Sequence, residues 1–493
     1  MDTKVANEPF ITLANIPNAF AKFTWNAKMH IFNKYALEVM KAGRRCYLEP
    51  NNPMPWPWEL NELAAIFVSG EDGKLEELPD PLFRIMINAL RSAAPKRAFK
   101  GIDDVKRYLS YNVAMQQFPY QQDALIVFLR YKFLFSVVDE THGLDMPRKF
   151  RTTFNVDYED VAALSALTFL AAAQNIFWDK YIWDFKRKHS CRISATFESV
   201  VELFAIDRHD YAKRQAALIR FSSDGLSNAQ NLLEQYPFVK TRDDYFLPLP
   251  YLVNLATTRH LFDRMMEKNS GLRSLVGRWG MEPYVKYLFE RSACYDSVNG
   301  SFSYRCDRNV VDSPDVWLQI GKTSIFVEVK LAEAPVELRQ GFEMQVVETR
   351  RLAAKHVYQL FSRLAEICNG KARNIICPSW EDVFGVVVIH EDSYTVREEI
   401  YKQCFDEHPE LSDAEREWIR THISLVALYS IEQFCYHHCS ILPALQDRET
   451  ERAGAESILL NVDFLKGAKL DLPLSNDLVP IVKEIPVRLF VPN

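Results

Sequence analysis

The sequence has no excess of positive charge, since 59 lysines and arginines face 65 aspartates and glutamates, giving a formal net charge of −6. Proteins that bind nucleic acid over a broad surface are usually basic, because phosphate contacts supply most of the nonspecific affinity. A broadly cationic surface is therefore excluded. If this chain binds nucleic acid, its basic residues must be gathered in a local groove.

The chain also lacks the patterns of exported and membrane-spanning proteins. It begins Met1-Asp2-Thr3-Lys4, without the basic start and apolar core of a signal peptide. Its nine cysteines are scattered and odd in number, which favours reduced thiols over a disulfide framework. The most apolar window, Val161 to Trp178, contains polar residues and is flanked by acids, so it is interpreted as a buried helix. These features predict a cytoplasmic protein with no membrane partner.

Several familiar catalytic and ligand motifs are missing. The sequence has neither a helical His-Glu-x-x-His motif nor a serine nucleophile elbow. The Gly321-Lys322-Thr323-Ser324 segment resembles the end of a phosphate-binding loop, but Val316 occupies the position of the earlier glycine. Cys435 to Cys439 lacks the second ligand pair that a structural zinc requires. Neither segment is interpreted as a ligand site.

With 493 residues, nearly half of them apolar, the chain is long enough for two or three domains. Up to about residue 270 the apolar residues have mainly helical spacing, for example in Gln121 to Val138 and Tyr158 to Trp178. A short hairpin is predicted at Tyr236 to Pro250, and Asn269-Ser270-Gly271 marks a boundary. We predict two helical domains, the second with the hairpin, and a larger third domain, at 1–150, 151–270 and 271–493.

Beyond this boundary the pattern changes to mixed α and β. A helix is predicted at Glu282 to Arg291, and it begins at Glu282 because Pro283 suits the first position of a helix. Further elements follow in the order strands, helix, strand, at the Tyr304 region, Val316 to Ile320, Thr323 to Leu331, Glu343 to Cys368 and Val383 to Ile389. The fold class is therefore a mainly helical first region followed by an α/β domain.

A two-residue turn at Gly321-Lys322 determines how two of these strands pair. Glycine in the first central position suits a type II′ hairpin, because that position needs a positive φ. The resulting register sets Val316 opposite Val327 and Asp315 opposite Glu328. Opposed residues have Cβ atoms about 4.5 to 5.5 Å apart. Two carboxylates that close repel each other, and a divalent cation with hard oxygen ligands, Mg²⁺ or alternatively Mn²⁺, removes the conflict.

Lys330 lies two residues beyond Glu328, so both side chains fall on one face of the strand. An ammonium group there would orient a metal-activated water and stabilise the charge that develops on a phosphorane. Pro314-Asp315, twelve intervening residues and Glu328-Val329-Lys330 together resemble the signature of the PD-(D/E)XK nuclease superfamily, which includes restriction endonucleases. The resemblance covers roughly Val276 to Asp392 and implies an αβββαβ fold of the restriction-endonuclease-like kind.

The resemblance also implies roles for individual residues. Asp315, Glu328 and Lys330 would be catalytic, and the metal ligands would be Asp315, Glu328 and the backbone of Val329. Members of the superfamily often add a glutamate from the first helix, and Gly280-Met281-Glu282 resembles that element, which makes Glu282 a fourth candidate. The alternative interpretation of the acids and the lysine is a surface ion pair on an exposed sheet.

The long predicted helix supplies a local positive field that the overall composition lacks. Arg351 and Lys355 are one turn apart and share a face, where they would bind phosphates. Gln345 and Gln359 are candidates to reach the scissile strand. Some branches of the superfamily carry a glutamine and a tyrosine four residues apart on this helix, and this chain does not. The alternative is that these polar residues are the solvated side of the helix.

The resemblance implies a Mg²⁺-dependent endonuclease that hydrolyses phosphodiester bonds, with DNA preferred to RNA because most members cut DNA. The helical first region would then serve recognition or regulation, through a partner protein or self-association. A nuclease joined to a large sensing region resembles microbial anti-phage defence effectors, an analogy of architecture alone. The alternatives are a non-catalytic binding module for nucleic acid or protein on a degenerate nuclease fold, and a helical interaction protein with an unrelated α/β appendage.

Overall fold

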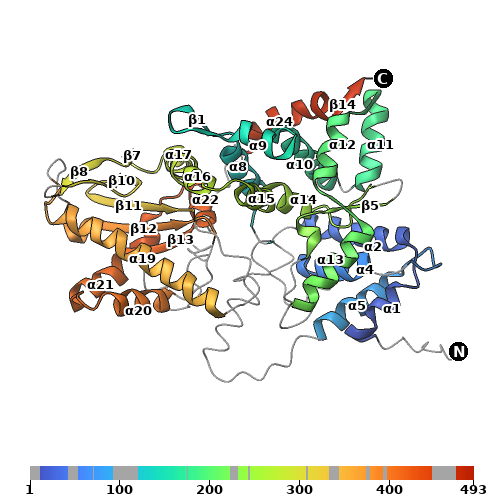
Figure 1. Cartoon of the computed structure of the whole chain (residues 1–493), viewed down its shortest axis with the longest axis horizontal. Helices are drawn as coiled ribbons and strands as arrows, with labels where there is room; N and C mark the ends of the chain where they lie inside the picture. Colours follow the sequence, from blue (N-terminus) through green and yellow to red (C-terminus); the bar gives the residue numbers. More distant parts are fainter. Residues whose placement is uncertain are drawn as a thin grey trace.

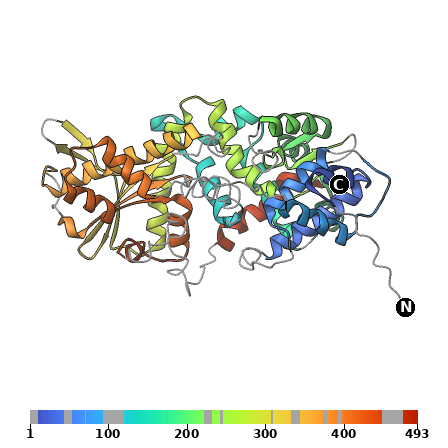
Figure 2. The same ribbon diagram turned by 90° about the horizontal axis from the view of Figure 1, so that it is seen from below.

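A computed structural model of the chain describes residues 11–42, 54–69, 72–92, 120, 122–174, 176–221, 231–241, 245–306, 309–331, 343–372, 378–391, 397–446 and 474–492. The largest sheet lies at the left of Figure 1 with α19, α20 and α21 below it, the N-terminal helices lie at the lower right, and most of the other helices lie between and above these two groups. The view from below in Figure 2 keeps the same separation along the long axis. The molecule thus has a sheet-containing half and a helical half.

The N-terminal helices share an aromatic core. They are η1 (Leu13–Asn15), α1 (Ile16–Phe20), α2 (Trp25–Ala42), α4 (Pro57–Ser69) and α5 (Asp80–Ser92). The rings of Phe32 and Phe67 stack with centroids 5.0 Å apart, and Phe83 meets Phe32 edge-on at 5.2 Å. Aromatic pairs at these separations add to the free energy gained by burying the rings.

The central part of the chain is helical with three small sheets. Its elements are α8 (Ala124–Phe135), β1 (Val138–Asp139), η3 (Glu140–His142), β2 (Leu144–Asp145), α9 (Met146–Phe154), α10 (Tyr158–Ala173), α11 (Trp178–His189), β3 (Cys191–Ile193), α12 (Ala195–Leu203), β4 (Ala205–Asp207), α13 (Arg208–Phe221), η5 (Leu232–Glu234), β5 (Phe238–Lys240), β6 (Tyr245–Phe246), α14 (Leu252–Leu255), η6 (Ala256–His260) and α15 (Leu261–Lys268). The predicted hairpin is present, because β5 pairs antiparallel with β6.

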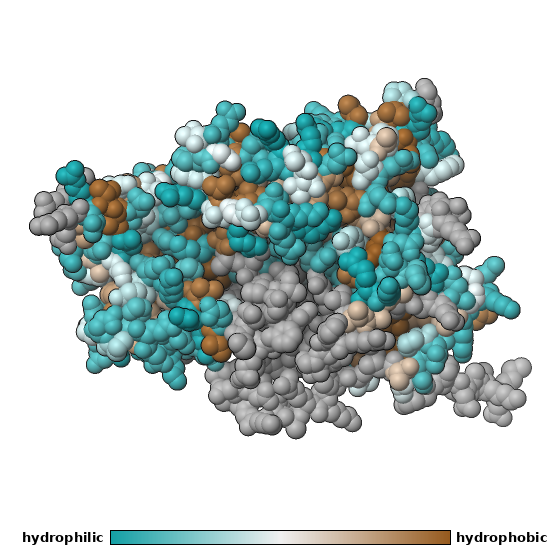
Figure 3. Space-filling model, viewed as in Figure 1, coloured by the Kyte–Doolittle hydropathy of each residue, from teal (hydrophilic) through white to brown (hydrophobic). Residues whose placement is uncertain are grey.

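Helix α10 confirms the interpretation of the most apolar window as a buried helix. Val161, Leu164 and Leu167 on it are fully buried among other helices of the central region. Among the described residues, the helices are either too short or too polar to cross a bilayer. On the face drawn in Figure 3 hydrophilic residues predominate, and apolar ones form small separate groups. The cysteines in the described ranges are free thiols, as predicted.

The carboxyl half is mixed α and β, as predicted. Its elements are α16 (Leu272–Val276), η7 (Gly277–Met281), α17 (Glu282–Ser292), β7 (Ser297–Gly300), β8 (Ser303–Cys306), β9 (Asn309–Asp312), β10 (Val316–Ile320), β11 (Thr323–Lys330), α19 (Glu343–Cys368), η8 (Trp380–Asp382), β12 (Val383–Ile389), α20 (Arg397–Glu407), α21 (Asp413–His422), β13 (Ile423–Ala427), α22 (Leu428–Tyr436), α23 (Leu442–Gln446), α24 (Leu474–Leu489) and β14 (Phe490–Pro492). The predicted sequence of helix, strands, helix and strand is present in this list.

Five strands form one mixed sheet in the order β13-β12-β11-β10-β7. Strand β10 is antiparallel to β7 and to β11, whereas β12 is parallel to β11 and to β13. The predicted hairpin register is confirmed, with Val316 opposite Val327 and Ile320 opposite Thr323. Gly321 has a φ of 55°, the positive value that the first central residue of a type II′ turn takes.

Helices cover both faces of this sheet. Val327 and Val329 of β11 pack with α17 and α22 on one face, whereas Phe326 packs with α19 on the other. This alternation follows from the two-residue period of a strand. Both faces are therefore buried, and polar side chains on β11 can reach solvent only near its ends.

Helix α17 begins at Glu282, as predicted, but it continues a helical run that starts earlier in the chain. Residues 272–292 form one continuous helical run in which the five residues of η7 are a π turn. Met281 and Glu282 both have right-handed helical dihedral angles. Pro283 inside a helix removes a backbone donor and crowds the preceding turn, and the wider π turn directly before it accommodates that ring. Glu282 thus lies within the helical run and not at its cap.

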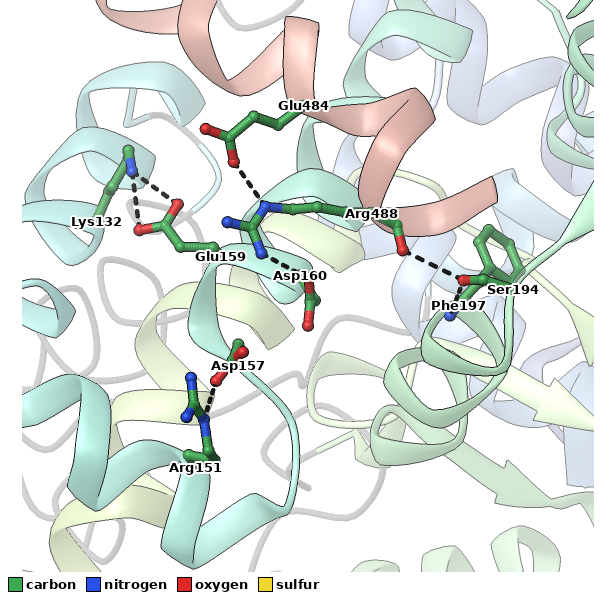
Figure 4. Close-up of polar contacts among 9 residues, drawn as sticks. All are labelled: Lys132, Arg151, Asp157, Glu159, Asp160, Ser194, Phe197, Glu484 and Arg488. Carbon is green, nitrogen blue, oxygen red and sulfur yellow. Dashed lines mark hydrogen bonds and ion pairs between the residues drawn. The ribbon is translucent and has the colours of Figure 1, made fainter. Parts of the chain in front are cut away.

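The C-terminal segment, which the sequence prediction grouped with the last domain, packs on the central helices. Strand β14 pairs antiparallel with β3, and Ile481, Ile485 and Leu489 of α24 join the apolar core around α10. Figure 4 shows the polar part of this contact, in which Arg488 reaches Asp160 of α10 at 3.0 Å and Glu484 on its own helix at 2.6 Å. The end of the chain is therefore built into the helical half.

A buried ion pair joins the two halves. Arg130 of α8 donates two hydrogen bonds to the carboxylate of Glu432 on α22, at 2.7 and 2.5 Å. The hydroxyl of Tyr284 on α17 donates to the same carboxylate at 2.8 Å. Both charged side chains are almost completely buried. A buried pair of this kind fixes the geometry of its three helices, because separating the charges leaves each without water.

Glu432→Gln is expected to lower the free energy of unfolding by about 3 to 5 kcal/mol, since it leaves the Arg130 guanidinium buried without its counter-charge. The measurement is urea-induced unfolding followed by circular dichroism. Glu290→Gln, on an exposed part of α17, is the matched control and should change stability by less than about 0.5 kcal/mol. A similarly small loss for Glu432→Gln would show that the pair does not hold the halves together.

Candidate active site

The predicted catalytic residues meet at the carboxyl end of β11. Asp315 lies directly before β10, one position beyond the last paired residues Val316 and Val327, and Glu328 directly follows Val327 on β11. The Asp315 carboxylate accepts a hydrogen bond from the Val329 amide at 2.7 Å. The Lys330 ammonium donates to Glu328 at 2.5 Å. The hairpin therefore brings the acid pair and the lysine together, as its register predicts.

The face of β11 that carries these residues is apolar beneath α19 and polar at its end. The rings of Trp317 and Phe326 stack with centroids 5.7 Å apart and an interplanar angle of 7°, and Phe326 is buried against α19. Farther along the strand, Glu328 and Lys330 are only 17% and 26% exposed. The charged groups thus lie in a partly enclosed setting and not on an open sheet surface.

Enclosure changes the ionisation of two carboxyl groups. Burial, reinforced by the nearby charge of Glu328, raises the pKa of Asp315 to about 7. Burial, together with the charges of Asp315 and Glu328, raises the pKa of Glu282 to about 8. The charges of Asp315 and Glu328 thus act on Glu282, although it comes from a different element. Three carboxyl groups therefore share one local field.

Arg278 moderates this field and was not recognised from the sequence. It lies on η7, and its positive charge acts to lower the pKa of both Glu282 and Asp315. Its guanidinium also approaches Asp312 at 3.8 Å and is largely exposed. The signal in the sequence was its position four residues before Glu282, which has meaning only if the helix continues through Pro283.

His356 on α19 is a second residue that sequence reasoning missed. It is half-buried, and burial together with the positive charge of Lys330 lowers its pKa to about 4. Its Nδ1 lies 3.4 Å from Oε1 of Gln359. At neutral pH it is therefore an uncharged imidazole beside the lysine. Among the basic side chains of this helix, a lone histidine gave no separate signal in the sequence.

The predicted nucleic-acid contacts on α19 differ in their surroundings. Arg351, Lys355 and Gln359 are all exposed, as residues four apart on one helix face should be. Arg351 is engaged by Glu407 at 3.5 Å and by Glu348 at 3.9 Å. Gln345 belongs to α19, but its side chain lies outside the described part of the structure. Lys355 is thus the better placed of the two predicted cations for an external phosphate.

The donor set at the end of β11 suits a hard divalent cation. Asp315 and Glu328 supply carboxylate oxygens, which Mg²⁺ and Mn²⁺ prefer, and the raised pKa of Asp315 reflects a repulsion that a cation would remove. Within the described ranges, no group of three or more His, Cys, Asp and Glu side chains is arranged to hold a metal ion. The predicted ligand set contains only two side chains, those of Asp315 and Glu328, together with the Val329 backbone, so it is smaller than a group of this kind.

Comparisons with protein-family models, curated proteins and solved structures find no match for this chain. The interpretation of the site therefore depends on its own residues. Their distinguishing feature is a pair of enclosed carboxyl groups, Asp315 and Glu328, next to a lysine, with the pKa of Asp315 raised. Carboxyl groups with strongly shifted pKa values in a partly enclosed setting are more frequent at functional sites than elsewhere.

The free energy of unfolding should fall as pH rises, in part because of Glu282. Folding raises its pKa from the usual range near 4 to about 8, so the folded chain binds more protons than the unfolded chain between these values. The contribution of Glu282 to the free energy of unfolding therefore falls as pH rises from about 4 to about 8. Glu282→Gln removes that contribution and should flatten the decline, as measured by urea unfolding across this pH range.

The control is Glu290→Gln, an exposed position on the same helix, which should leave the pH dependence of the wild-type protein intact. The comparison between the two variants isolates Glu282 from every other titrating group. If Glu282→Gln and Glu290→Gln decline in parallel between pH 4 and 8, then Glu282 is not held in its neutral form by the fold.

Proposed function

We propose that this chain is a Mg²⁺-dependent endonuclease that hydrolyses phosphodiester bonds, with DNA as the preferred substrate. The observation that carries the proposal is the meeting of Asp315, Glu328 and Lys330 at the end of β11, with the Asp315 pKa raised to about 7. A pair of acids that repel each other, next to a lysine, is suited to bind a cation and a phosphate together.

The order of elements supports the same proposal. Helix α17, strands β7, β10 and β11, helix α19 and strand β12 follow one another, apart from the small β8–β9 hairpin between β7 and β10. This is the αβββαβ order that the resemblance to PD-(D/E)XK nucleases implies. The acids and the lysine lie at the positions in that order where the superfamily carries its signature. The helical half would then serve recognition or regulation.

Each residue has a role that follows from its contacts. When bound, Mg²⁺ would supply a Lewis acid that polarises the phosphate and lowers the pKa of a water molecule. Asp315 and Glu328 would hold it, and the Val329 amide orients Asp315 by its 2.7 Å hydrogen bond. Lys330 is kept near these acids by Glu328, where its ammonium would stabilise negative charge in the transition state. Glu282 would act beside this ligand set and not within it, because no group of three such side chains is arranged to hold a metal ion in the described ranges.

Cleavage should require the acid pair and the lysine. Asp315→Ala and Lys330→Ala are each expected to lower the rate of Mg²⁺-dependent cleavage by at least about 100-fold, because the first removes a carboxylate that would hold the cation and the second removes a positive charge that would stabilise the transition state. The assay incubates the purified protein with plasmid, single-stranded DNA and RNA in Mg²⁺, Mn²⁺ or EDTA. Lys322→Ala, an exposed lysine in the turn of the same hairpin, is the matched control and should cleave like the wild type.

Persistent cleavage in both Asp315→Ala and Lys330→Ala would remove these residues from the mechanism. A wild-type protein that binds nucleic acid but cuts none of the three substrates in either metal would instead identify a non-catalytic binding module. Cleavage of RNA but not of DNA would support the proposed phosphodiester hydrolysis and show that the substrate is RNA.

Lys355, the exposed lysine on α19, should contribute to substrate binding and not to the chemical step. Lys355→Ala is expected to raise KM several-fold with little change in kcat, since a phosphate contact outside the reacting group stabilises substrate and transition state alike. The dependence of log affinity on log salt concentration should become shallower by about one unit. Arg363→Ala on the same helix, where the arginine faces Glu366, should leave KM unchanged; an equal rise in KM for both would deny Lys355 a specific role.

A further inference from the structure

The ends of β11 and β12 are joined by one hydrogen bond next to the candidate site. The two strands run parallel, and their last paired residues are Lys330 and Ile389. Directly beyond them, the amide of His390 donates to the carbonyl oxygen of Lys330 at 3.0 Å. The backbone that carries Lys330 is thereby tied to the segment that follows β12, and a displacement of this segment would displace the lysine.

That segment is held from the helical half. Glu391 follows His390 and meets Arg259 of η6, whose Nη2 donates to Oε2 at 2.7 Å while Nε lies 2.5 Å from Oε1. The two side chains are only 16% and 12% exposed. A hydrogen-bonded ion pair between guanidinium and carboxylate in such a setting fixes orientation better than an exposed ion pair does.

His390 itself is locked between aromatic rings of the helical half. It is 2% exposed, and its ring lies 5.8 Å from that of Tyr131 on α8 and 5.6 Å from that of Phe262 on α15. These contacts leave the segment little room to shift. Together with the Arg259 pair, they make the helical half the support against which the end of the sheet rests.

The support has an unusual backbone. Residues 256–260 of η6 form a π turn between α14 and α15. Such wide turns are rare in proteins overall, and those that occur are often at functional sites. Its last two residues face different partners, since Arg259 reaches Glu391 whereas His260 lies 3.6 Å from Glu234. The Glu234 carboxylate in turn accepts hydrogen bonds from Tyr120 at 2.6 Å and from Asn61 of α4 at 2.9 Å.

We propose that Arg259 is a positioning residue for the candidate nuclease site, and that the π turn of η6 connects the N-terminal helices to Lys330. The chain of contacts runs from Asn61 through Glu234 to this turn, and from Arg259 through Glu391 and His390 to the Lys330 carbonyl. The effect on cleavage rests on the proposed function. The effect on the backbone of β11 does not, because it depends on these contacts alone.

The test combines amide hydrogen exchange with cleavage kinetics on the full chain. Arg259→Gln should speed exchange in the peptide that covers 323–331, near the end of β11. It should also lower kcat by about 10- to 100-fold with KM changed less than about threefold, because a small displacement of a catalytic group costs rate. Arg259→Lys keeps the charge but not the planar guanidinium, and it should recover part of both effects.

Arg488→Gln is the matched control, because it removes a partly buried ion pair with Asp160 in the helical half that is remote from the sheet. It should leave exchange in 323–331 unchanged. Unchanged exchange in Arg259→Gln, or an equal increase in Arg488→Gln, would overturn the proposal. If exchange is faster in Arg259→Gln alone, and the wild-type protein cuts no nucleic acid, the positioning link is supported and the nuclease function is rejected.

Discussion

The antiparallel pairing of β10 with β11 is the constraint on which the candidate site depends. One glycine with positive φ closes the turn, the turn sets the register, and the register sets Asp315 and Glu328 directly beyond the last pair, Val316 and Val327. A shift by one residue would send every side chain to the opposite face of the sheet. The acid pair therefore exists because the apolar residues between it and the turn have a single favourable alignment.

Burial of both sheet faces gives this pair its electrostatic character. Helices α17 and α22 cover one face and α19 covers the other, so water reaches the carboxyl groups only near the strand ends. Low hydration favours their neutral forms, and the pKa values of Asp315 and Glu282 rise as a result. The same packing brings Arg278 into the field of these acids and His356 into the field of Lys330, from two separate helices.

The sequence predicted those parts of the structure that follow from local rules. The hairpin register, the buried character of α10 and the alternation along β11 each depend on neighbours within a few residues. It did not predict that this helix continues an earlier helical run, because a proline at the first position usually marks the start of a helix and Pro283 here follows a π turn. The role of His356 and the docking of α24 could not be predicted, since each depends on a contact between elements distant in sequence, whereas the role of Arg278 depends on the helical run that precedes Pro283. The element order was predictable, whereas the family assignment still depends on the motif alone.

The position of the C-terminal segment has a consequence for the architecture as a whole. The chain passes from the helical half to the sheet near residue 271 and returns to the helical half with α24 and β14. Two covalent connections therefore cross between the halves instead of one, which restricts rotation of one half about the other. A shortened chain that ended before α24 would lose this second crossing, expose the apolar side of α10 and deprive β3 of its partner strand, although the missing residues follow the sheet in sequence.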